Sequence, residues 1–431
     1  MKIALVTAFP PSRKALAEYG LHVAEQLRDN SAIELVVLGD YLPDSVPELT
    51  GFEVVRCWGF DRASNLATIS RAVRSLEPDL VWFNLGFASF GAKPLAAMAG
   101  LATPMVLRLF GIYTHVTLHQ LFETVDLMDA GVTRPRLYRI GGWLATHMLL
   151  GANAVSVLLP AYRRLLQENY KRGHVHSRSH GIFSARPEPP DFSKRGNPVH
   201  RILAFGKWGT YKRVDVLVDA FEKFGAELPG VELVIAGPDH PKTAGYIAAA
   251  AAQYANSGIR FLGYVPEASI GPLFQSASVT VMPYTSSAGS SGVAHLAAQY
   301  GVPIIASDIR DFRELAEHEG IAIEFFNAGE PASLAETLRE VLRSPALMRK
   351  MAEQNFAAAL HITMPEVVRE YIRSFDQDRR LRVLQDLSRL RRLPAWHPQR
   401  KSLVGRCAWQ VRSWAEVSDQ NDSPKRNPPV R

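Results

Sequence analysis

Residues 201–221 read RILAFGKWGTYKRVDVLVDAF and decide the fold of the second half of the chain. A short apolar run ends at Gly206, as in a buried strand, and apolar side chains then recur at helical spacing. The loop between them carries Lys207 and Lys212. Backbone amides at a helix start favour an anion, and Gly206 and Gly209 permit close backbone approach. The stretch therefore predicts a phosphate site, although two solvated surface lysines are the ordinary alternative.

A second loop of small residues lies at residues 285–292, TSSAGSSG. The residues before it, 277–284, are rich in β-branched side chains and predict a strand. Residues 293–300 predict a helix that ends before Gly301. Small hydroxyl residues at a helix start can be simple N-caps. An unbroken run of them, on the same half of the chain as the lysine loop, instead favours one shared pyrophosphate pocket.

The bulk composition is that of an ordinary globular protein of two domains, with 431 residues, 47% apolar and 21% charged. Two cysteines, Cys57 and Cys407, are too few for a disulfide framework and indicate a reducing compartment. The apolar N-terminal run is too short for a signal peptide, and the apolar segment 94–106 is too short to span a bilayer. We therefore expect a cytoplasmic protein.

The net charge of +7 comes from residues 379–431, which contain 13 Lys and Arg and 4 Asp and Glu. The rest of the chain has 36 basic and 38 acidic residues and is nearly neutral. Leucines alternate with arginines from Arg380 to Arg392, and three tryptophans follow. This pattern suits the inner face of an anionic membrane. A solvated, partly disordered tail is an equally good interpretation. Nucleic acid is disfavoured as a partner because no recognition module accompanies the charge.

Strands and helices alternate twice along the chain, which predicts an α/β fold of two Rossmann-like domains with parallel sheets. The strands predicted in the first half are residues 3–9, 33–37, 52–55, 80–83, 104–108 and 154–158. The predicted parts of the chain are an N-terminal domain (1–185), a Pro-rich linker (186–199), a C-terminal domain (200–360), a helix (361–378) and the basic tail (379–431). Because ligands bind at the carboxyl ends of such strands, we expect the site in a cleft between the two domains.

The order of the motifs resembles the retaining glycosyltransferases of family 4 (glycosyl transferases group 1), which have the GT-B architecture. The resemblance covers most of residues 1–375. It rests on Gly206-Lys207 with Lys212 six residues after the glycine, on Ile235-Ala-Gly-Pro238, on Phe261-Leu-Gly-Tyr-Val-Pro266 and on Gly301-Val-Pro-Ile-Ile-Ala-Ser-Asp308. Each motif alone is a weak signal, whereas their order and spacing together are specific.

The resemblance implies transfer of a sugar from a nucleotide sugar to a saccharide or lipid-linked acceptor, with retention, in polysaccharide or glycolipid synthesis. It implies catalytic roles for His119, Lys207 and Lys212, with the lysines on the donor diphosphate. The implied donor-binding residues are Gly206, Gly237, Tyr264, Val265, Ser290, Ser291, Gly292, Val293 and His295. The implied acceptor-side loop contains Ser12, Glu18, Tyr19 and Gly20.

The sequence departs from the family at two glutamates that are normally separated by seven residues. Their positions fall near Ala288 and Leu296, and neither residue is acidic. His295 is the nearest polar side chain. Asp308 and Asp311 remain as contacts to donor hydroxyls, or as helix N-caps.

The expected mechanism uses no cofactor and no metal. The only Asp-x-Asp triplet, residues 376–378, lies outside the two predicted domains, whereas two lysines and backbone amides can stabilise a leaving diphosphate. A nucleotide-sugar-binding protein without transferase activity and a GT-B-type epimerase remain as alternatives. A dehydrogenase is disfavoured because no strand is followed by Gly-x-Gly-x-x-Gly.

Overall fold

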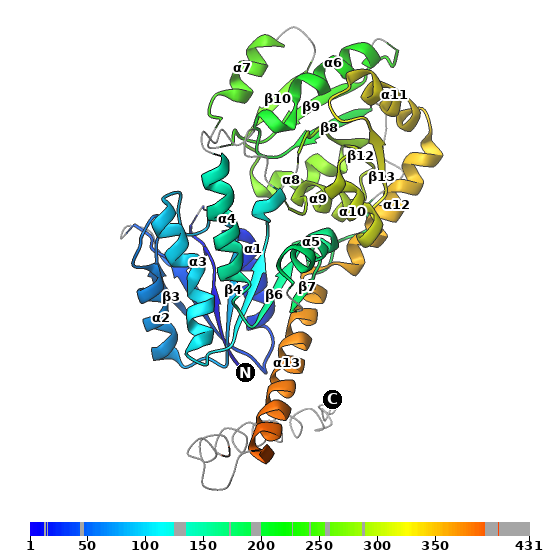
Figure 1. Ribbon diagram of the computed structural model, residues 1–431. Helices are drawn as coiled ribbons and strands as arrows, with labels where there is room; N and C mark the ends of the chain where they lie inside the picture. Colours follow the sequence, from blue (N-terminus) through cyan, green and yellow to red (C-terminus); the bar gives the residue numbers. More distant parts are fainter. Residues whose placement is uncertain are drawn as a thin grey trace, which may run out of the picture. The chain divides into compact units, whose positions relative to one another are not determined.

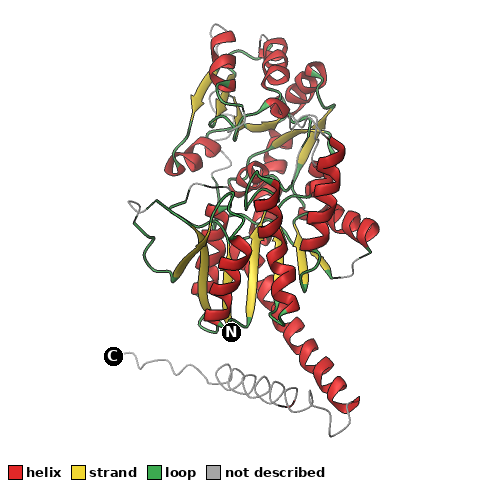
Figure 2. Ribbon diagram, turned by 60° about the vertical axis from the view of Figure 1, so that its left-hand side comes forward, coloured by secondary structure: helices red, strands yellow, loops and turns green. Residues whose placement is uncertain are grey.

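The computed structural model describes most of the chain, namely residues 1–12, 14, 16–43, 47–124, 135–171, 174–190, 200–225, 227–240, 243–254, 259–286, 289–392 and 404. The chain forms two compact units, one of residues 1–29 and 33–367 and one of residues 30–32 and 368–431. The first unit contains two parallel β-sheets with helices packed on them (Figures 1 and 2). We call residues 1–177 lobe 1 and residues 200–361 lobe 2.

Lobe 1 is built on a seven-stranded parallel sheet of order β3-β2-β1-β4-β5-β6-β7. Its strands are β1 (Lys2–Val6), β2 (Glu34–Asp40), β3 (Val54–Trp58), β4 (Leu80–Leu85), β5 (Thr114–Leu118), β6 (Ala154–Val157) and β7 (Val175–Ser177). The central strands are buried along nearly their whole length, as expected of a parallel sheet with both faces covered. The strand order reverses between β1 and β4, so the loops after these strands diverge and leave room for a ligand.

Lobe 2 repeats this plan with a six-stranded parallel sheet of order β10-β9-β8-β11-β12-β13. Its strands are β8 (Arg201–Phe205), β9 (Glu232–Ala236), β10 (Arg260–Gly263), β11 (Val279–Met282), β12 (Ile304–Ser307) and β13 (Ile323–Phe326). Here the order reverses between β8 and β11. The two loops singled out in the sequence, after Phe205 and after Met282, therefore lie at this switch point.

Helices connect the strands in both lobes. In lobe 1 they are α1 (Ala17–Arg28), α2 (Asn65–Leu76), α3 (Pro94–Leu109), α4 (Pro135–Leu149) and α5 (Pro160–Tyr170). In lobe 2 they are α6 (Val214–Gly225), α7 (Tyr246–Gln253), α8 (Glu267–Gln275), α9 (Gly292–Gln299), α10 (Arg310–Glu319), α11 (Pro331–Leu342) and α12 (Pro345–His361). A final helix, α13, spans Met364–Arg392. The expected α/β fold with two Rossmann-like sheets is confirmed.

One predicted strand is wrong. Residues 104–108 belong to α3, and the fifth strand is Thr114–Leu118 instead. A short apolar run gives the same signal in a buried helix and in a buried strand, and the more apolar residues 104–108 gave a stronger signal than Thr114–Leu118, where polar side chains alternate with only two aliphatic ones. The correction places His119 directly after the carboxyl end of β5.

The two lobes touch where α5 of lobe 1 meets α10 of lobe 2. The backbone amide of Ala161 donates to Glu314 Oε2 at 3.0 Å, and Arg164 forms an ion pair with the same carboxylate. The hydroxyl of Tyr162 donates to Asp311 Oδ2 at 2.8 Å. Polar groups from the start of α5 thus bind the first two turns of α10.

The C-terminal region is described as far as Arg392, apart from Val404. Leu381, Leu384 and Leu387 of α13 are exposed, as in the predicted basic amphipathic helix. The three tryptophans of the tail, and the linker from residue 191 to residue 199, lie outside the described residues. Among the helices that the structure describes, none combines the length and apolar character needed to cross a membrane.

Candidate functional site

Lys212 is a buried basic side chain at the carboxyl end of the lobe 2 sheet. It closes the short helical turn Thr210–Lys212 between β8 and α6, and it is 6% exposed. Its Nζ lies 4.6 Å from the ring centre of Tyr284 and 5.7 Å from that of Trp208. Burial, and next the charge of Lys207, lower the pKa of Lys212 to about 7. No carboxylate in the described part of the chain pairs with it, and an uncompensated buried charge is costly, so the site suits an anionic ligand.

The surroundings of this ammonium group contain further donors. A Cβ at Gly206, where φ is +135°, would lie 2.5 Å from Lys212 Nζ and 3.4 Å from Val293. Lys212 therefore lies between the loop after β8 and the start of α9. Gly292 and Val293 open that helix, so their amides have no acceptor within it. Ser290 Oγ is shielded from solvent and has no hydrogen-bond partner among the described residues. We call Lys212, the amides of Gly292 and Val293 and the hydroxyl of Ser290 the candidate anion cradle.

Lys207 is exposed and lies at the rim of the same region. Its charge acts on Lys212 in lobe 2 and on Glu18 in lobe 1. Burial and the neighbouring Glu267 raise the pKa of Glu18, while His22 and Lys207 oppose the rise. The two predicted lysines are thus close to each other but differ in their access to water.

The loop between β11 and α9 is held by lobe 1. The backbone amide of Gly289 donates to the hydroxyl of Tyr162 at 2.7 Å. A Cβ at Gly289, where φ is +117°, would lie 2.5 Å from the carbonyl oxygen of His119. Only glycine fits this approach. The anion cradle of lobe 2 and the end of β5 in lobe 1 are therefore neighbours.

His119 is held by a buried polar chain that runs across the ends of three strands. Its Nε2 lies 2.6 Å from Asn84 Oδ1, and Asn84 Nδ2 donates to Thr7 Oγ1 at 3.0 Å. Since the amide nitrogen of Asn84 serves Thr7, its oxygen accepts from His119, which places the imidazole proton on Nε2. Burial, and next His180, keep the pKa of His119 well below its usual value. The ring of Tyr19 packs edge-on against the imidazole of His119, with 4.5 Å between the two ring centres. Because His119 is neutral and carries its proton on Nε2, its Nδ1 is unprotonated.

The acceptor-side residues are not all in a loop, which corrects the expectation. Glu18, Tyr19 and Gly20 lie in the first turn of α1, and only Ser12 precedes the helix. A Cβ at Gly20 would lie 2.7 Å from the side chain of Thr7, so this glycine lets α1 pack onto the end of β1. Ser12 Oγ donates to Asp40 Oδ2 at 2.8 Å, so its proton is engaged in a hydrogen bond within lobe 1.

The nucleobase-side residues divide into one structural glycine and two partly accessible residues. A Cβ at Gly237 would lie 1.9 Å from the carbonyl oxygen of Gly206, so Gly237 is needed for packing against the lysine loop. Tyr264 is 73% exposed and Val265 is half-buried. An exposed tyrosine beside the strand ends is available to a ligand.

His295 and the two aspartates have partners within the protein. His295 is buried against Glu319, with 2.8 Å between Nε2 and Oε2. Asp308 pairs with Arg313 at 2.5 Å, and Asp311 accepts from Tyr162. The structure shows neither aspartate side chain as a helix cap, and Ala288 lies outside the described residues.

Several residues of the site were missed in the sequence. Thr7 and Asn84 follow or end strands β1 and β4 at the switch point, and that placement is a signal that could have found them. Tyr162 and Glu319 bind residues that are distant in the sequence. No local sequence pattern predicts these contacts.

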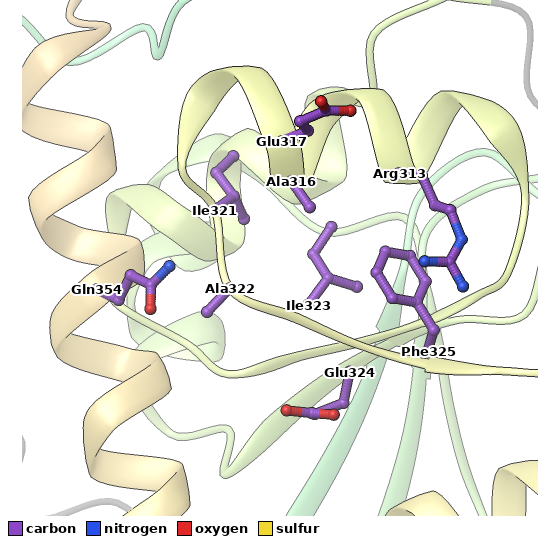
Figure 3. Close-up of a pocket in the computed structure, with 9 residues that line it drawn as sticks. All are labelled: Arg313, Ala316, Glu317, Ile321, Ala322, Ile323, Glu324, Phe325 and Gln354. Carbon is purple, nitrogen blue, oxygen red and sulfur yellow. The ribbon is translucent and has the colours of Figure 1, made fainter.

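A separate hollow of about 460 Å³ lies away from these residues, at the edge strand β13 (Figure 3). It is lined by side chains of α10, β13 and α12, among them Arg313, Phe325 and Gln354. Arg313 lies over the ring of Phe325 and is paired with Asp308. None of the predicted site residues lines this hollow.

Comparison with known proteins agrees with this arrangement. Residues 199–344 match the family model described as Glycosyl transferases group 1. A search of curated proteins finds no match. Among solved structures, sucrose-phosphate synthase from Thermosynechococcus elongatus aligns with a TM-score of 0.70 at 16% identity, over 87% of this chain and 98% of that one.

Two further structures show the same fold. HepE from Anabaena, solved in complex with UDP-glucose, aligns with a TM-score of 0.64 at 16% identity, over 88% of this chain and 100% of its own. WaaG, a glycosyltransferase involved in lipopolysaccharide biosynthesis, aligns with a TM-score of 0.59 at 14% identity, over 86% and 98%. Residues 199–344 are thus similar to the Glycosyl transferases group 1 model, and the chain shares its two-lobed GT-B fold with these solved structures.

Proposed function

We propose that this protein is a glycosyltransferase that moves a sugar from a nucleotide sugar to a hydroxyl acceptor. The observation that carries the proposal is the buried ammonium group of Lys212, which no described carboxylate neutralises and which lies beside the start of α9. A nucleotide diphosphate supplies the missing negative charge. The neighbour HepE, solved with UDP-glucose, has the same fold, which supports this class of donor.

The proposed reaction breaks the bond between the sugar carbon and the diphosphate oxygen and forms a bond to the acceptor oxygen. Negative charge then develops on the diphosphate, where Lys212, Lys207 and the amides at the start of α9 stabilise it. The departing phosphate oxygen takes the acceptor proton, which gives retention at the sugar carbon. His119 lies near the cradle and, with Nδ1 unprotonated, accepts a hydrogen bond from a sugar hydroxyl.

The donor can be identified by thermal stabilisation, since a bound ligand raises stability by mass action. We expect one of UDP-, GDP- or ADP-sugars to raise the melting temperature of the wild type but not that of Lys212→Met. Release of nucleoside diphosphate from that donor then tests turnover. Stabilisation by no nucleotide sugar would contradict the proposal.

We further propose that the reaction needs no metal ion, because cationic side chains and amides are already placed at the cradle. Turnover should be unchanged after EDTA treatment. Loss of turnover that Mg²⁺ or Mn²⁺ restores would show that a cation shares the charge stabilisation.

The exposed side chains on one layer of helices in lobe 1 support the proposal that the acceptor is lipid-linked and lies at the cytoplasmic face of a membrane. Helices α2, α3 and α4 lie side by side and contain no aspartate or glutamate (Figure 1). On α4, Ile140 is 65% and Trp143 is 54% exposed, beside exposed Arg136 and Arg139. Exposed aliphatic and aromatic side chains between arginines suit an anionic bilayer.

Vesicle flotation tests this membrane contact. The double variant Ile140→Ser, Trp143→Ser should float less with vesicles of phosphatidylglycerol and phosphatidylcholine, whereas Leu262→Ser, an exposed leucine of lobe 2, should float as the wild type does. Removal of residues 393–431 separates the contribution of the basic tail. Equal flotation of the wild type and of the lobe 1 double variant would contradict a membrane contact through α4.

A nucleotide-sugar-binding protein without transfer is the second candidate, because neither Leu296 nor Ala288 supplies the carboxylate that the family usually has. The same assay decides between them. A donor that binds, but gives no nucleoside diphosphate with or without acceptor extracts, favours the binding protein. Conversion of the donor into an isomer without any acceptor favours an epimerase.

A further inference from the structure

His295 has a hydrogen-bond acceptor at each ring nitrogen. Nδ1 lies 2.7 Å from the carbonyl oxygen of Ser291, and Nε2 lies 2.8 Å from Glu319 Oε2. The carbonyl oxygen has no proton to give, and a carboxylate only accepts. A neutral imidazole carries a single N–H, so both bonds are satisfied together only when His295 is an imidazolium cation.

Glu319 is the carboxylate that stabilises this cation. It is the last residue of α10, and its side chain is 5% exposed. Burial raises its pKa, but His295 and a hydrogen bond from Ser179 outweigh burial and leave the pKa lowered. For His295 burial lowers the pKa, and Glu319 and Ser291 outweigh it, so the pKa is raised. Both shifts agree with a charged pair.

Among the described residues, the other titratable group that faces the pair is His180, in the segment after β7. Its ring lies 5.0 Å from that of His295. His180 Nδ1 donates to the carbonyl oxygen of Gly181, and burial, followed by His295, lowers its pKa to about 4. His180 is therefore neutral at physiological pH. The imidazolium and the carboxylate cancel, so the pair adds little net charge to the anion cradle.

The contact with Ser291 gives the pair its effect on the cradle. The carbonyl of Ser291 and the amide of Gly292 belong to the same planar peptide group. Fixing the direction of the carbonyl therefore fixes the amide N–H, which points the opposite way. Ser291 Oγ also caps α9 by accepting from the amide of Ala294. The Ser291 carbonyl also accepts the first hydrogen bond of α9, from the backbone amide of His295 at 3.2 Å. The ring of His295 adds a shorter second bond to this carbonyl and so strengthens the orientation of the first amide of α9.

We propose that Glu319 keeps His295 charged so that His295 holds the Ser291–Gly292 peptide in the orientation that receives a diphosphate. Both are positioning residues, which act through the backbone and do not touch the donor. This inference rests on the proposed function, since it assigns a role in the same diphosphate site. The α9 segment has no carboxylate of its own, and α10 supplies one.

Calorimetric binding of inorganic pyrophosphate and of UDP tests the proposal. Glu319→Gln keeps the shape and one acceptor oxygen but removes the charge. We expect roughly 10- to 100-fold weaker binding, the usual effect of losing a hydrogen bond to a charged group. The matched control is Glu317→Gln, an exposed residue of the same helix, which should bind as the wild type does.

The pH dependence separates positioning from a general loss of stability. Binding requires protonated His295, so affinity should fall as pH rises through the pKa of His295. In Glu319→Gln that pKa is lower, so the fall should begin at lower pH than in the wild type. Lys212 titrates in both proteins, and the difference between their profiles therefore reports His295.

Nitrogen NMR of His295 tests the charged state without any variant. We expect an imidazolium signal in the ligand-free wild type at pH 7.5. A neutral imidazole signal would overturn the proposal, even if Glu319→Gln failed to fold. Wild-type affinity and an unchanged pH profile in Glu319→Gln would also overturn it. If the wild type bound neither pyrophosphate nor UDP, the proposed function would fail together with this role.

Discussion

The strand ends of the two lobes differ in how their polar groups are satisfied. In lobe 2, Lys212 has no counter-ion among the described residues, and Ser290 Oγ has no partner there. In lobe 1, Thr7, Asn84 and His119 satisfy one another in a neutral chain. From this difference we infer that the strand ends of lobe 2 bind the negative charge of the ligand, whereas those of lobe 1 hold the ring of His119 in a fixed orientation. Substitutions in lobe 2 should therefore weaken anion binding, and those in lobe 1 should mainly lower turnover.

The largest effect is expected for Lys212→Met, which keeps much of the apolar stem and removes the charge. Loss of one preorganised group that stabilises developing charge costs about 10²- to 10³-fold in turnover. Steady-state kinetics with the identified donor checks this value. Near-normal turnover in a folded variant would contradict the division between the lobes.

A second test uses the lowered pKa of Lys212, about 7 against the ordinary 10.5. Between these values the unfolded chain binds more protons than the folded chain. The Lys212 contribution to the free energy of unfolding thus rises with pH, by at most about 1.4 kcal/mol per pH unit. Urea unfolding at several pH values should show this rise in the ligand-free wild type and not in Lys212→Met.

Diphosphate binding should respond to pH in the opposite direction. A bound anion favours the charged form of Lys212, so affinity should fall by up to about tenfold per pH unit above pH 7. Calorimetry with UDP from pH 6 to pH 9 measures this fall. A pH-independent affinity would show that Lys212 is already charged in the free protein.

The contrast between the lobes also explains which parts of the site could be predicted. The sequence indicates the lobe 2 part of the site because its residues lie in two short stretches, one with Lys207 and Lys212 and one with the small-residue loop. Each stretch shows its anion-binding groups without any contact to a distant part of the chain. The polar chain of lobe 1 joins three strands through contacts between residues up to 77 positions apart. No period or motif encodes such a pairing. Only the strand order, with its reversal between β1 and β4, brings these side chains together.

The fold follows the same division. Most strands were predicted because their apolar runs are bounded by glycine, proline or charged residues. Segment 104–108 failed because a buried helix is as apolar as a buried strand. The first turn of α1 was missed because Gly20, a poor helix former, is required there by contact with Thr7. In both cases tertiary packing overrode the local signal.

Asn84→Leu tests the orienting role of lobe 1 with a smaller expected effect. It removes the acceptor of His119 and leaves a buried N–H unpaired, which costs about 1–3 kcal/mol. We expect roughly tenfold lower turnover and little change in the affinity for UDP. Ser156→Ala is the matched control, because it removes a hydroxyl that lies 3.0 Å from another buried histidine, His115 of strand β5. A large loss of UDP affinity in Asn84→Leu would remove the distinction between the lobes.

The smallest effect is expected for Lys207→Met, and it sharpens the comparison within lobe 2 itself. Lys207 is exposed, so water and salt screen its charge, and exposed charge interactions contribute about 0.2–1 kcal/mol. That range corresponds to about a one- to fivefold loss of donor affinity, and the loss should shrink as salt is added. Lys207 also lowers the pKa of Lys212, so its removal should move the pH dependence of UDP binding toward higher pH. A loss as large as that of Lys212→Met would mean that donor binding draws Lys207 out of water, and burial in the free protein would then be a poor guide to which lysine carries the charge.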